Sequence, residues 1–311
     1  MNQASNSKSV KFIVLFFGVI SISAAAIFIR LAQKDVNSFV IAAARMIFST
    51  IPIIPIVMYR HLPEIRKISK KDLFLSLLAG LFLAIHFASW ITSLEYTTIA
   101  SSVVIVCTTP IWVTLFGIIF FHEKVDKVIL IGVFLTLLGG IIIALSESCS
   151  TSFLHPVCNF EMTQSAGNRI LGNILALLGA LTAAGYFMIG KTVRKQVSLI
   201  PYVFIVYATS AIFLCVLLIF SGSEIHPYQP LTYLWLILLA IFPQLIGHSL
   251  FNWSLKYISA TYVAIATMGE PVGSTILAII IFREIPTPLK VVGAIIILVG
   301  IYIVSRESST A

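Results

Sequence analysis

Apolar side chains fill the chain in long blocks, and charged or turn-forming residues separate one block from the next. A helix that crosses a bilayer needs about 20 mainly apolar residues. Blocks of this length recur from one end of the chain to the other, and they predict an all-α integral membrane protein with ten transmembrane helices. The expected spans are 11–31, 38–59, 72–94, 97–120, 128–145, 170–190, 200–220, 231–253, 260–281 and 289–305.

The composition supports this assignment. Of the 311 residues, 59% are hydrophobic and 10% are charged, with a mean hydropathy of +1.04, whereas soluble domains carry about 45–50% apolar and about 25% charged residues. The lipid bilayer is therefore the expected surroundings of most of the surface. The net charge of +8 does not indicate a nucleic-acid partner, because the Lys and Arg residues form short clusters between apolar blocks and no basic arm.

The positions of the cations predict the orientation. If both termini are cytoplasmic, most Lys and Arg residues fall in inside connections, as membrane proteins prefer. Arg45 then lies within a span, and the outside connections hold only Arg30, Lys34, Arg169, Arg283 and Lys290. We therefore expect a multi-pass protein of the cell's inner (cytoplasmic or plasma) membrane with both termini inside.

An internal repeat organises the chain. At an offset of 161 residues, Tyr96 matches Tyr257, Pro110 matches Pro271, and the run that includes Gly132 and Gly139 matches Gly293 and Gly300. Each repeat holds five spans, and because five is odd the second repeat enters the membrane from the opposite side. The expected units are a five-helix repeat over 11–145, an extracytoplasmic connecting loop over 146–169, and a second repeat over 170–305. Inverted repeats of this kind are typical of secondary transporters.

The first span is expected to be retained rather than removed as a signal peptide, because its loss would break the repeat.

At these residues the sequence resembles a known family. Thr109-Pro110-Ile111-Trp112, with the Glu and Gly residues that follow, and Gly269-Glu270-Pro271-Val272, with its own Glu and Gly residues, look like two tandem EamA domains of the drug/metabolite transporter superfamily. The resemblance implies a ten-helix, inverted-repeat carrier, with four helices of each half around a central cavity and the fifth outside it, often at a homodimer contact. The connection 146–169 is longer than the family usually has between its halves.

Two charges lie within spans. Glu270 is the only carboxylate near the middle of a span, and Arg45 lies about two turns into the second span. Intramembrane charges are costly and mark functional sites by default. Glu270 is expected either to contact a substrate amine or couple a proton, or to be held by hydrogen bonds beside Pro271. Arg45 is expected either to bind a substrate carboxylate or to pair statically with Glu270 or a backbone carbonyl. Together they would suit a zwitterion such as an amino acid.

Two prolines recur at equivalent positions in the fourth and ninth spans. Pro110 and Pro271 each leave one backbone carbonyl without its helical partner. Two readings remain: a hinge or broken helix at the cavity, or a static kink whose carbonyl is satisfied by Thr108, Thr109 or Thr267.

Aromatic and hydrogen-bonding side chains supply further candidates for a substrate site. His86 and His248 could titrate near neutral pH, although hydrogen-bonded structural roles fit both better. The candidates are His86, Trp90, Trp112, Tyr186, Tyr207, Gln244, His248, Asn252 and Trp253. The residues assigned to substrate binding are Arg45, His86, Trp90, Trp112, Tyr186, Tyr207, His248, Asn252 and Glu270. Gln244 and Trp253 are not assigned.

The remaining features are assigned to structure. The glycine pairs Gly132/Gly139 and Gly293/Gly300 each lie on one helix face and are expected to allow close packing, of spans five and ten against each other or against a second subunit. Glu123 and Glu284 are expected to cap the helices that follow them. Cys149 and Cys158 lie in the outside connection, where a disulfide could form.

No motif of ATP binding, dinucleotide binding, metalloprotease or serine-hydrolase chemistry occurs in the sequence. We therefore expect no enzyme, cofactor or metal. The predicted function is alternating-access transport of a small organic metabolite, an amino acid or related compound, with export favoured. Multidrug or cationic-compound efflux is the alternative, and a membrane-embedded lipid-modifying enzyme is a distant one.

Overall fold

The computed structural model describes residues 8–97, 99–122, 124–148, 166–222, 226–283 and 286–307, and every regular element within these ranges is a helix. The first half of the chain contains α1 (Lys8–Ser23), α2 (Ala25–Ala32), α3 (Ser38–Thr50), α4 (Ile53–Ile56), η2 (Val57–His61), α5 (Leu62–Ile65), α6 (Lys70–Tyr96), α7 (Ile99–Val106), α8 (Thr109–Phe121) and α9 (Lys127–Ser148). The second half contains α10 (Ala166–Val193), α11 (Leu199–Phe220), α12 (Pro230–Leu239), η3 (Ala240–His248), α13 (Ser249–Ser254), α14 (Ala260–Thr267), α15 (Glu270–Phe282) and α16 (Pro288–Glu307).

Nine helical segments in the described part of the chain are long and apolar enough to cross a membrane. They occupy every predicted position except the fifth, which coincides with the apolar helix α9. The all-helical membrane fold is confirmed, whereas the predicted count of exactly ten spans stays a prediction. Several spans consist of two or more consecutive helices, so the chain has more individual helices than membrane-spanning segments.

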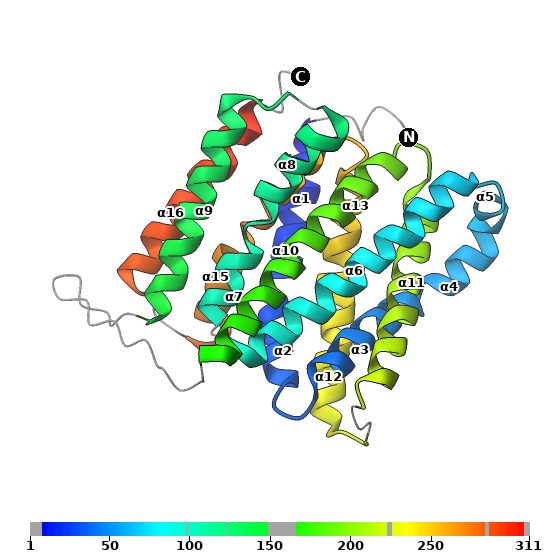
Figure 1. The fold of residues 1–311 in the computed structure, drawn as a ribbon, viewed down its shortest axis with the longest axis horizontal. Helices are drawn as coiled ribbons and strands as arrows, with labels where there is room; N and C mark the ends of the chain where they lie inside the picture. The colour runs from blue at the N-terminus through cyan, green and yellow to red at the C-terminus, as the bar shows by residue number, and fades with distance from the viewer. Residues whose placement is uncertain are drawn as a thin grey trace.

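The two halves run in opposite directions. In Figure 1, α1 and α2 descend through the molecule, whereas α10, the corresponding helix of the second half, ascends. α1 begins and α16 ends on the same side. This arrangement is the one that an odd number of crossings in each repeat requires.

The fourth and ninth spans are both broken near their middle. The helices α7 and α8 meet at Cys107 and Thr108, and α14 and α15 meet at Met268 and Gly269, 161 positions further on. In each case a proline occupies one of the first two positions of the second helix, where its missing N–H removes no helical bond from that helix. The repeat therefore places equivalent helix ends at equivalent positions.

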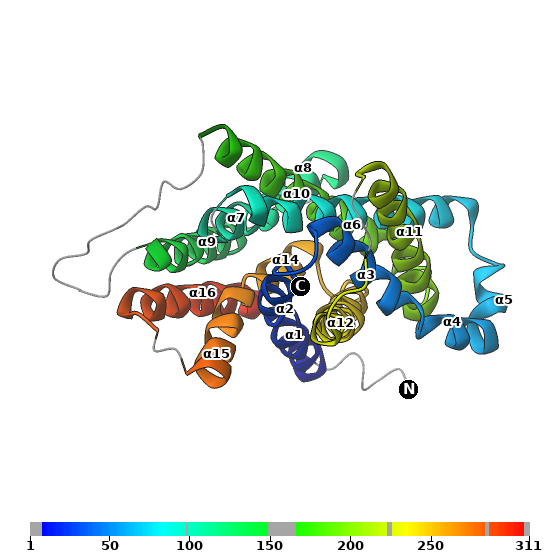
Figure 2. The same cartoon turned by 90° about the horizontal axis from the view of Figure 1, so that it is seen from below.

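The last helices of the two halves pack against each other at one edge of the molecule, as α9 and α16 show in both views (Figures 1 and 2). A Cβ atom built at Gly139 would lie 2.6 Å from the carbonyl O of Gly293, and one built at Gly293 would lie 2.7 Å from the carbonyl O of Gly139. Gly132 and Gly300 approach each other in the same way. The two predicted glycine pairs thus face each other within one chain. This close contact is possible because glycine has no Cβ atom.

Glu123 and Glu284, and the cysteines Cys149 and Cys158, lie outside the described residues. Their expected capping and disulfide roles stay predictions.

Candidate functional site

A cavity of about 80 Å³ lies between the two halves. This space holds several water molecules, since one water needs about 10–15 Å³ on the same measure. The cavity is lined by α1, α2, α3 and α6 of the first half, by α10, η3 and α13 of the second, and by residues at both helix breaks. Neither α9 nor α16 contributes a lining residue. The first four spans of the first half therefore line the cavity as the resemblance implies, but in the second half only three do, because α11 contributes no lining residue.

Most of the lining is apolar or aromatic. Phe87, Trp90, Tyr186, Phe187 and Phe251 supply rings from both halves. Small-molecule sites typically combine such walls with a few placed polar groups. Among the described lining residues, Arg45 and Glu270 carry the formal charges, one from each half.

Arg45 is held in place from two sides. Its side chain is 1% exposed, so it does not reach the bilayer surface. The guanidinium lies over the Phe87 ring, 3.9 Å from the ring centre, and Nε donates a hydrogen bond to Oε1 of Gln244 over 2.9 Å. Its Nη1 has no hydrogen-bond partner among the described residues, and neither has Nε2 of Gln244. Of these two buried donors, Arg45 Nη1 belongs to a residue that lines the cavity, whereas Gln244 lies behind the lining.

Glu270 is the first residue of α15, where the positive end of the helix dipole favours a carboxylate. Among the described residues, no ion pair joins it to Arg45, and none of the described hydrogen bonds involves its side chain. The two charges nevertheless lie within electrostatic range of each other, and Cys107 lies within range of Glu270. The static Arg45–Glu270 pair considered from the sequence is not what the structure contains, because Arg45 bonds Gln244 instead.

A second layer of polar side chains supports the lining. The hydroxyl of Tyr207 donates to the backbone carbonyl of Gln244 over 3.0 Å. Nδ2 of Asn252 donates to the hydroxyl of Tyr186 over 2.5 Å and to the carbonyl of His248 over 2.8 Å. Tyr207 and Asn252 thus lie behind the wall and hold residues that form it.

The two intramembrane histidines differ. His86 Nδ1 lies 2.9 Å from the carbonyl O of Gly179, and its ring stacks on Trp90 at 5.9 Å between centres. This contact fits the structural role favoured from the sequence. His248 Nδ1 and Trp90 Nε1 have no hydrogen-bond partner within the described chain, so both are available to a ligand.

The structure separates the predicted substrate-binding residues into two groups. Arg45, His86, Trp90, Tyr186, His248 and Glu270 line the cavity, whereas Trp112, Tyr207 and Asn252 do not. Trp112 donates its Nε1–H to Thr108 Oγ1 over 3.0 Å and braces the first helix break. Whether the lining residues bind substrate stays a prediction.

The predicted hinges also differ. Pro110 lines the cavity, while Pro271 does not. The carbonyl that Pro110 frees belongs to Val106, and Thr109 Oγ1 donates to it over 2.7 Å. A static kink requires such a local hydrogen bond to the freed carbonyl. The alternative, that Pro110 acts as a hinge, stays a prediction.

Sequence reasoning missed Phe87, the ring beneath Arg45, and Cys107. Neither carries a polar signal that distinguishes it from lipid-facing neighbours. In the described ranges, no group of three or more His, Cys, Asp or Glu side chains is arranged to hold a metal ion.

Two inverted helical halves enclose a small cavity with one charge from each half, which is an arrangement typical of membrane transporters. The chain belongs to the EamA-like transporter family, which it matches over residues 10–145 and 170–306.

Relatives of this chain are also transporters by name. It is 23% identical to an uncharacterized transporter from Archaeoglobus fulgidus, over 90% of this chain and 92% of that protein. It is 28% identical to solute carrier family 35 member G1 of Homo sapiens, over 90% of this chain and 75% of that protein. A solved crystal structure has the same fold, with a TM-score of 0.75 and 16% identity over 98% of this chain and 99% of that one.

Proposed function

We propose that this transporter exports a small organic metabolite, an amino acid or a related compound, by alternating access through the central cavity. The observation that carries the proposal is the pair of opposite charges, Arg45 and Glu270, on one apolar cavity and from opposite halves. A free amino acid presents a carboxylate and an ammonium group. Each would find its complement here, with Arg45 Nη1 available as a donor to the carboxylate.

The size of the cavity favours a small solute. Drug-sized ligands occupy pockets of about 300–1,000 Å³, whereas this cavity measures about 80 Å³. A larger compound would require the two halves to separate first. The aromatic rings that line the same cavity as Glu270 nevertheless support a second candidate, the efflux of organic cations, because cations bind aromatic faces.

Alternating access draws support from the paired helix breaks. Inverted-repeat carriers commonly place broken helices at a midplane site, with helix N-termini directed at it. Thr109 and Glu270 begin α8 and α15 and both line the cavity. Relative movement of the two halves would expose this site to one side and then to the other.

The direction, membrane and orientation are part of the proposal. The distribution of Lys and Arg favours both termini in the cytoplasm and insertion in the inner (cytoplasmic or plasma) membrane. The glycine faces that would suit a homodimer contact instead join α9 to α16 in one chain, so the proposal does not require a second copy.

The test is thermal stabilisation of the purified protein by a panel of amino acids, organic acids, nucleotides, sugars, polyamines and cationic dyes, because a ligand of the folded state raises its stability. We expect a hit among the amino acids that disappears in both Arg45→Ala and Glu270→Gln. The exposed residues Arg30 and Asp126 supply matched controls, Arg30→Ala and Asp126→Asn, which should keep the response.

A response confined to unrelated organic cations, lost in Glu270→Gln but kept in Arg45→Ala, would favour the second candidate. A hit that survives both cavity substitutions would place the ligand elsewhere and contradict the proposal. Export is then tested by the hit compound itself, loaded into inside-out and right-side-out vesicles.

A further inference from the structure

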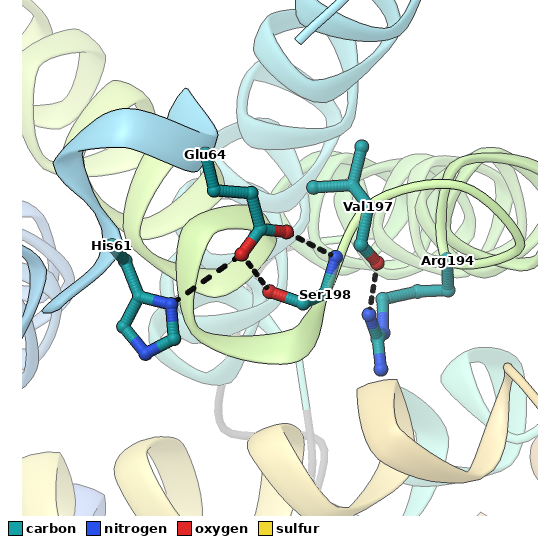
Figure 3. Close-up of polar contacts among 5 residues, drawn as sticks. All are labelled: His61, Glu64, Arg194, Val197 and Ser198. Carbon is teal, nitrogen blue, oxygen red and sulfur yellow. Dashed lines mark hydrogen bonds and ion pairs between the residues drawn. The ribbon is translucent and has the colours of Figure 1, made fainter. Parts of the chain in front are cut away.

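The turn between α10 and α11, residues 194–198, is held by a carboxylate from the other half of the chain (Figure 3). Oε1 of Glu64 accepts a hydrogen bond from the backbone N–H of Ser198 over 3.0 Å, and Oε2 accepts one from its hydroxyl over 2.7 Å. His61 Nδ1 lies 3.4 Å from the same Oε2. Ser198 precedes α11 and makes no cap with its own side chain. Glu64 therefore binds the residue that precedes α11, at the helix end that favours negative charge.

Arg194 ties the same turn to α13. Its side chain is 2% exposed. Nε donates to the backbone carbonyl of Asn252 over 3.0 Å, and Nη1 donates to the carbonyl of Val197 (Figure 3). Burial lowers the pKa of this guanidinium, and two nearby tyrosines and Glu64 oppose that shift. The Glu64 carboxylate, which binds Ser198 in this turn, is thus close enough to stabilise the positive charge of Arg194.

One residue connects this cation to the cavity. Asn252 is fully buried, and its backbone carbonyl accepts from Arg194 while its amide donates to the hydroxyl of Tyr186 over 2.5 Å. Tyr186 lines the cavity, whereas Arg194 and Asn252 do not. Hydrogen bonds therefore connect Glu64 at the turn to the cavity wall, with the peptide bond between Val197 and Ser198 as the one covalent step.

We propose that Arg194 is a positioning residue of the cavity: it fixes the backbone of Asn252, whose amide orients the Tyr186 hydroxyl. Glu64 acts one step further out, because it holds the turn that carries Arg194. Release of the Glu64–Ser198 contact, which joins the two halves, therefore loosens the cavity wall at Tyr186. The inference rests on the cavity being the site of the proposed transport, but its test reports the geometry of the cavity and needs no substrate.

Cys107 supplies the readout, because it lines the cavity and is a free thiol. We would measure its labelling rate with N-ethylmaleimide in the full-length protein, in a background in which Cys149, Cys158 and Cys215 are replaced by Ser. Arg194→Met should raise the rate by about tenfold, the effect expected when a hydrogen bond from a charged group is lost. Arg194→Lys should restore part of the difference, because Lys can still donate to the Asn252 carbonyl. The exposed neighbour gives the matched control, Lys195→Met, which should leave the rate unchanged.

A double-mutant cycle separates positioning from general loosening. If Arg194 acts through Tyr186, Arg194→Met should add little in a Tyr186→Phe background. Full additivity, or an unchanged rate in a folded Arg194→Met protein, would overturn the proposal.

Should Arg194→Met fail to fold, Ser198→Ala decides, because this side chain lies near the surface and donates directly to Glu64. It should raise the labelling rate by about threefold, a fraction of the tenfold effect, since only one of the two bonds to Glu64 is lost. An unchanged rate would again overturn the proposal. If no panel compound stabilises the protein, the proposed function fails while these labelling results stand, so the two failures are distinguishable.

Discussion

Thr109 and Glu270 occupy the same position in the two repeats. They are 161 residues apart, each begins the second helix of a broken span, and both line the cavity. Repeat symmetry therefore accounts for the position of the side chain but not for its charge. The cavity is symmetric in its backbone and asymmetric in its chemistry, with the carboxylate in the second half and the guanidinium of Arg45 in the first.

This asymmetry predicts how Glu270→Gln behaves. Burying a carboxylate in a membrane costs several kcal/mol on most scales, while its place at a helix N-terminus returns about 0.3–1 kcal/mol. Because no described hydrogen bond holds its side chain, Glu270→Gln should leave the melting temperature unchanged or raise it. The same variant should abolish the response to the stabilising ligand. Differential scanning fluorimetry of the purified protein, with and without that ligand, measures both.

The matched control is Thr109→Val, which alters the equivalent position of the first repeat without touching a charge. It removes the bond from Thr109 to the Val106 carbonyl, so it should lower the melting temperature and keep the ligand response. A large loss of stability in Glu270→Gln would instead assign Glu270 the structural role that the sequence left open.

The two prolines should respond differently to alanine. The carbonyl freed by Pro110 already accepts from Thr109, whereas no described hydrogen bond reaches the carbonyl of Thr267, which Pro271 frees. An N–H introduced by Pro271→Ala can bond that carbonyl and join α14 to α15. Pro271→Ala should therefore raise the melting temperature by more than Pro110→Ala and slow transport of the stabilising ligand into proteoliposomes. If both variants change the melting temperature and the transport rate equally, hydrogen bonding of the freed carbonyls does not determine how these helix breaks behave.

The sequence predicts the fold well because the relevant signals are local. Block length gives the spans, the 161-residue repeat gives the inverted halves, and the paired Pro110 and Pro271 indicate where the helices break. The cost of intramembrane charge places Arg45 and Glu270 inside the bundle rather than against lipid. Each of these inferences uses residues close in sequence or related by the repeat.

The rest of the site depends on how the helices rotate against one another. In a helix that is apolar all round, nothing in the sequence marks which face meets the cavity. Phe251 lines the cavity while its neighbour Asn252 lies behind it, although Asn252 is the stronger polar signal. The contact between Glu64 and Ser198 joins residues 134 positions apart and breaks the repeat symmetry, so no local pattern predicts it.

The connecting loop carries its own prediction. Cys149 and Cys158 are nine residues apart in the sequence, and an extracytoplasmic location would allow them to form a disulfide. Wild-type protein isolated from the membrane should then migrate faster on a non-reducing gel than Cys149→Ser, because the bridge closes a loop in the denatured chain. Cys215→Ser is the control and should migrate as wild type. Identical migration of all three proteins, with and without reductant, would contradict the bridge.

The contact between α9 and α16 predicts a sharp difference between two adjacent glycines. A Cβ atom at Gly139 would lie 2.6 Å from the backbone carbonyl O of Gly293, which cannot move aside without shifting α16. A Cβ atom at Gly140 meets nothing closer than the side-chain terminus of Met268, at 3.9 Å. Gly139→Ala should therefore destabilise the protein by about 1–3 kcal/mol, the usual cost of overpacking.

Gly140→Ala should instead be neutral or stabilising, because Ala is favoured over Gly in a helix by about 1 kcal/mol and meets no obstacle. Both substitutions add one methyl group to the same helix, so helix propensity and hydrophobicity cancel in the comparison. Thermal melting of the two variants in the same detergent measures the difference, and Gly293→Ala should reproduce the loss from the other side of the contact. If Gly139→Ala melts at the temperature of Gly140→Ala, the two helices do not pack through these glycines, and the outer face of α9 becomes available for another partner.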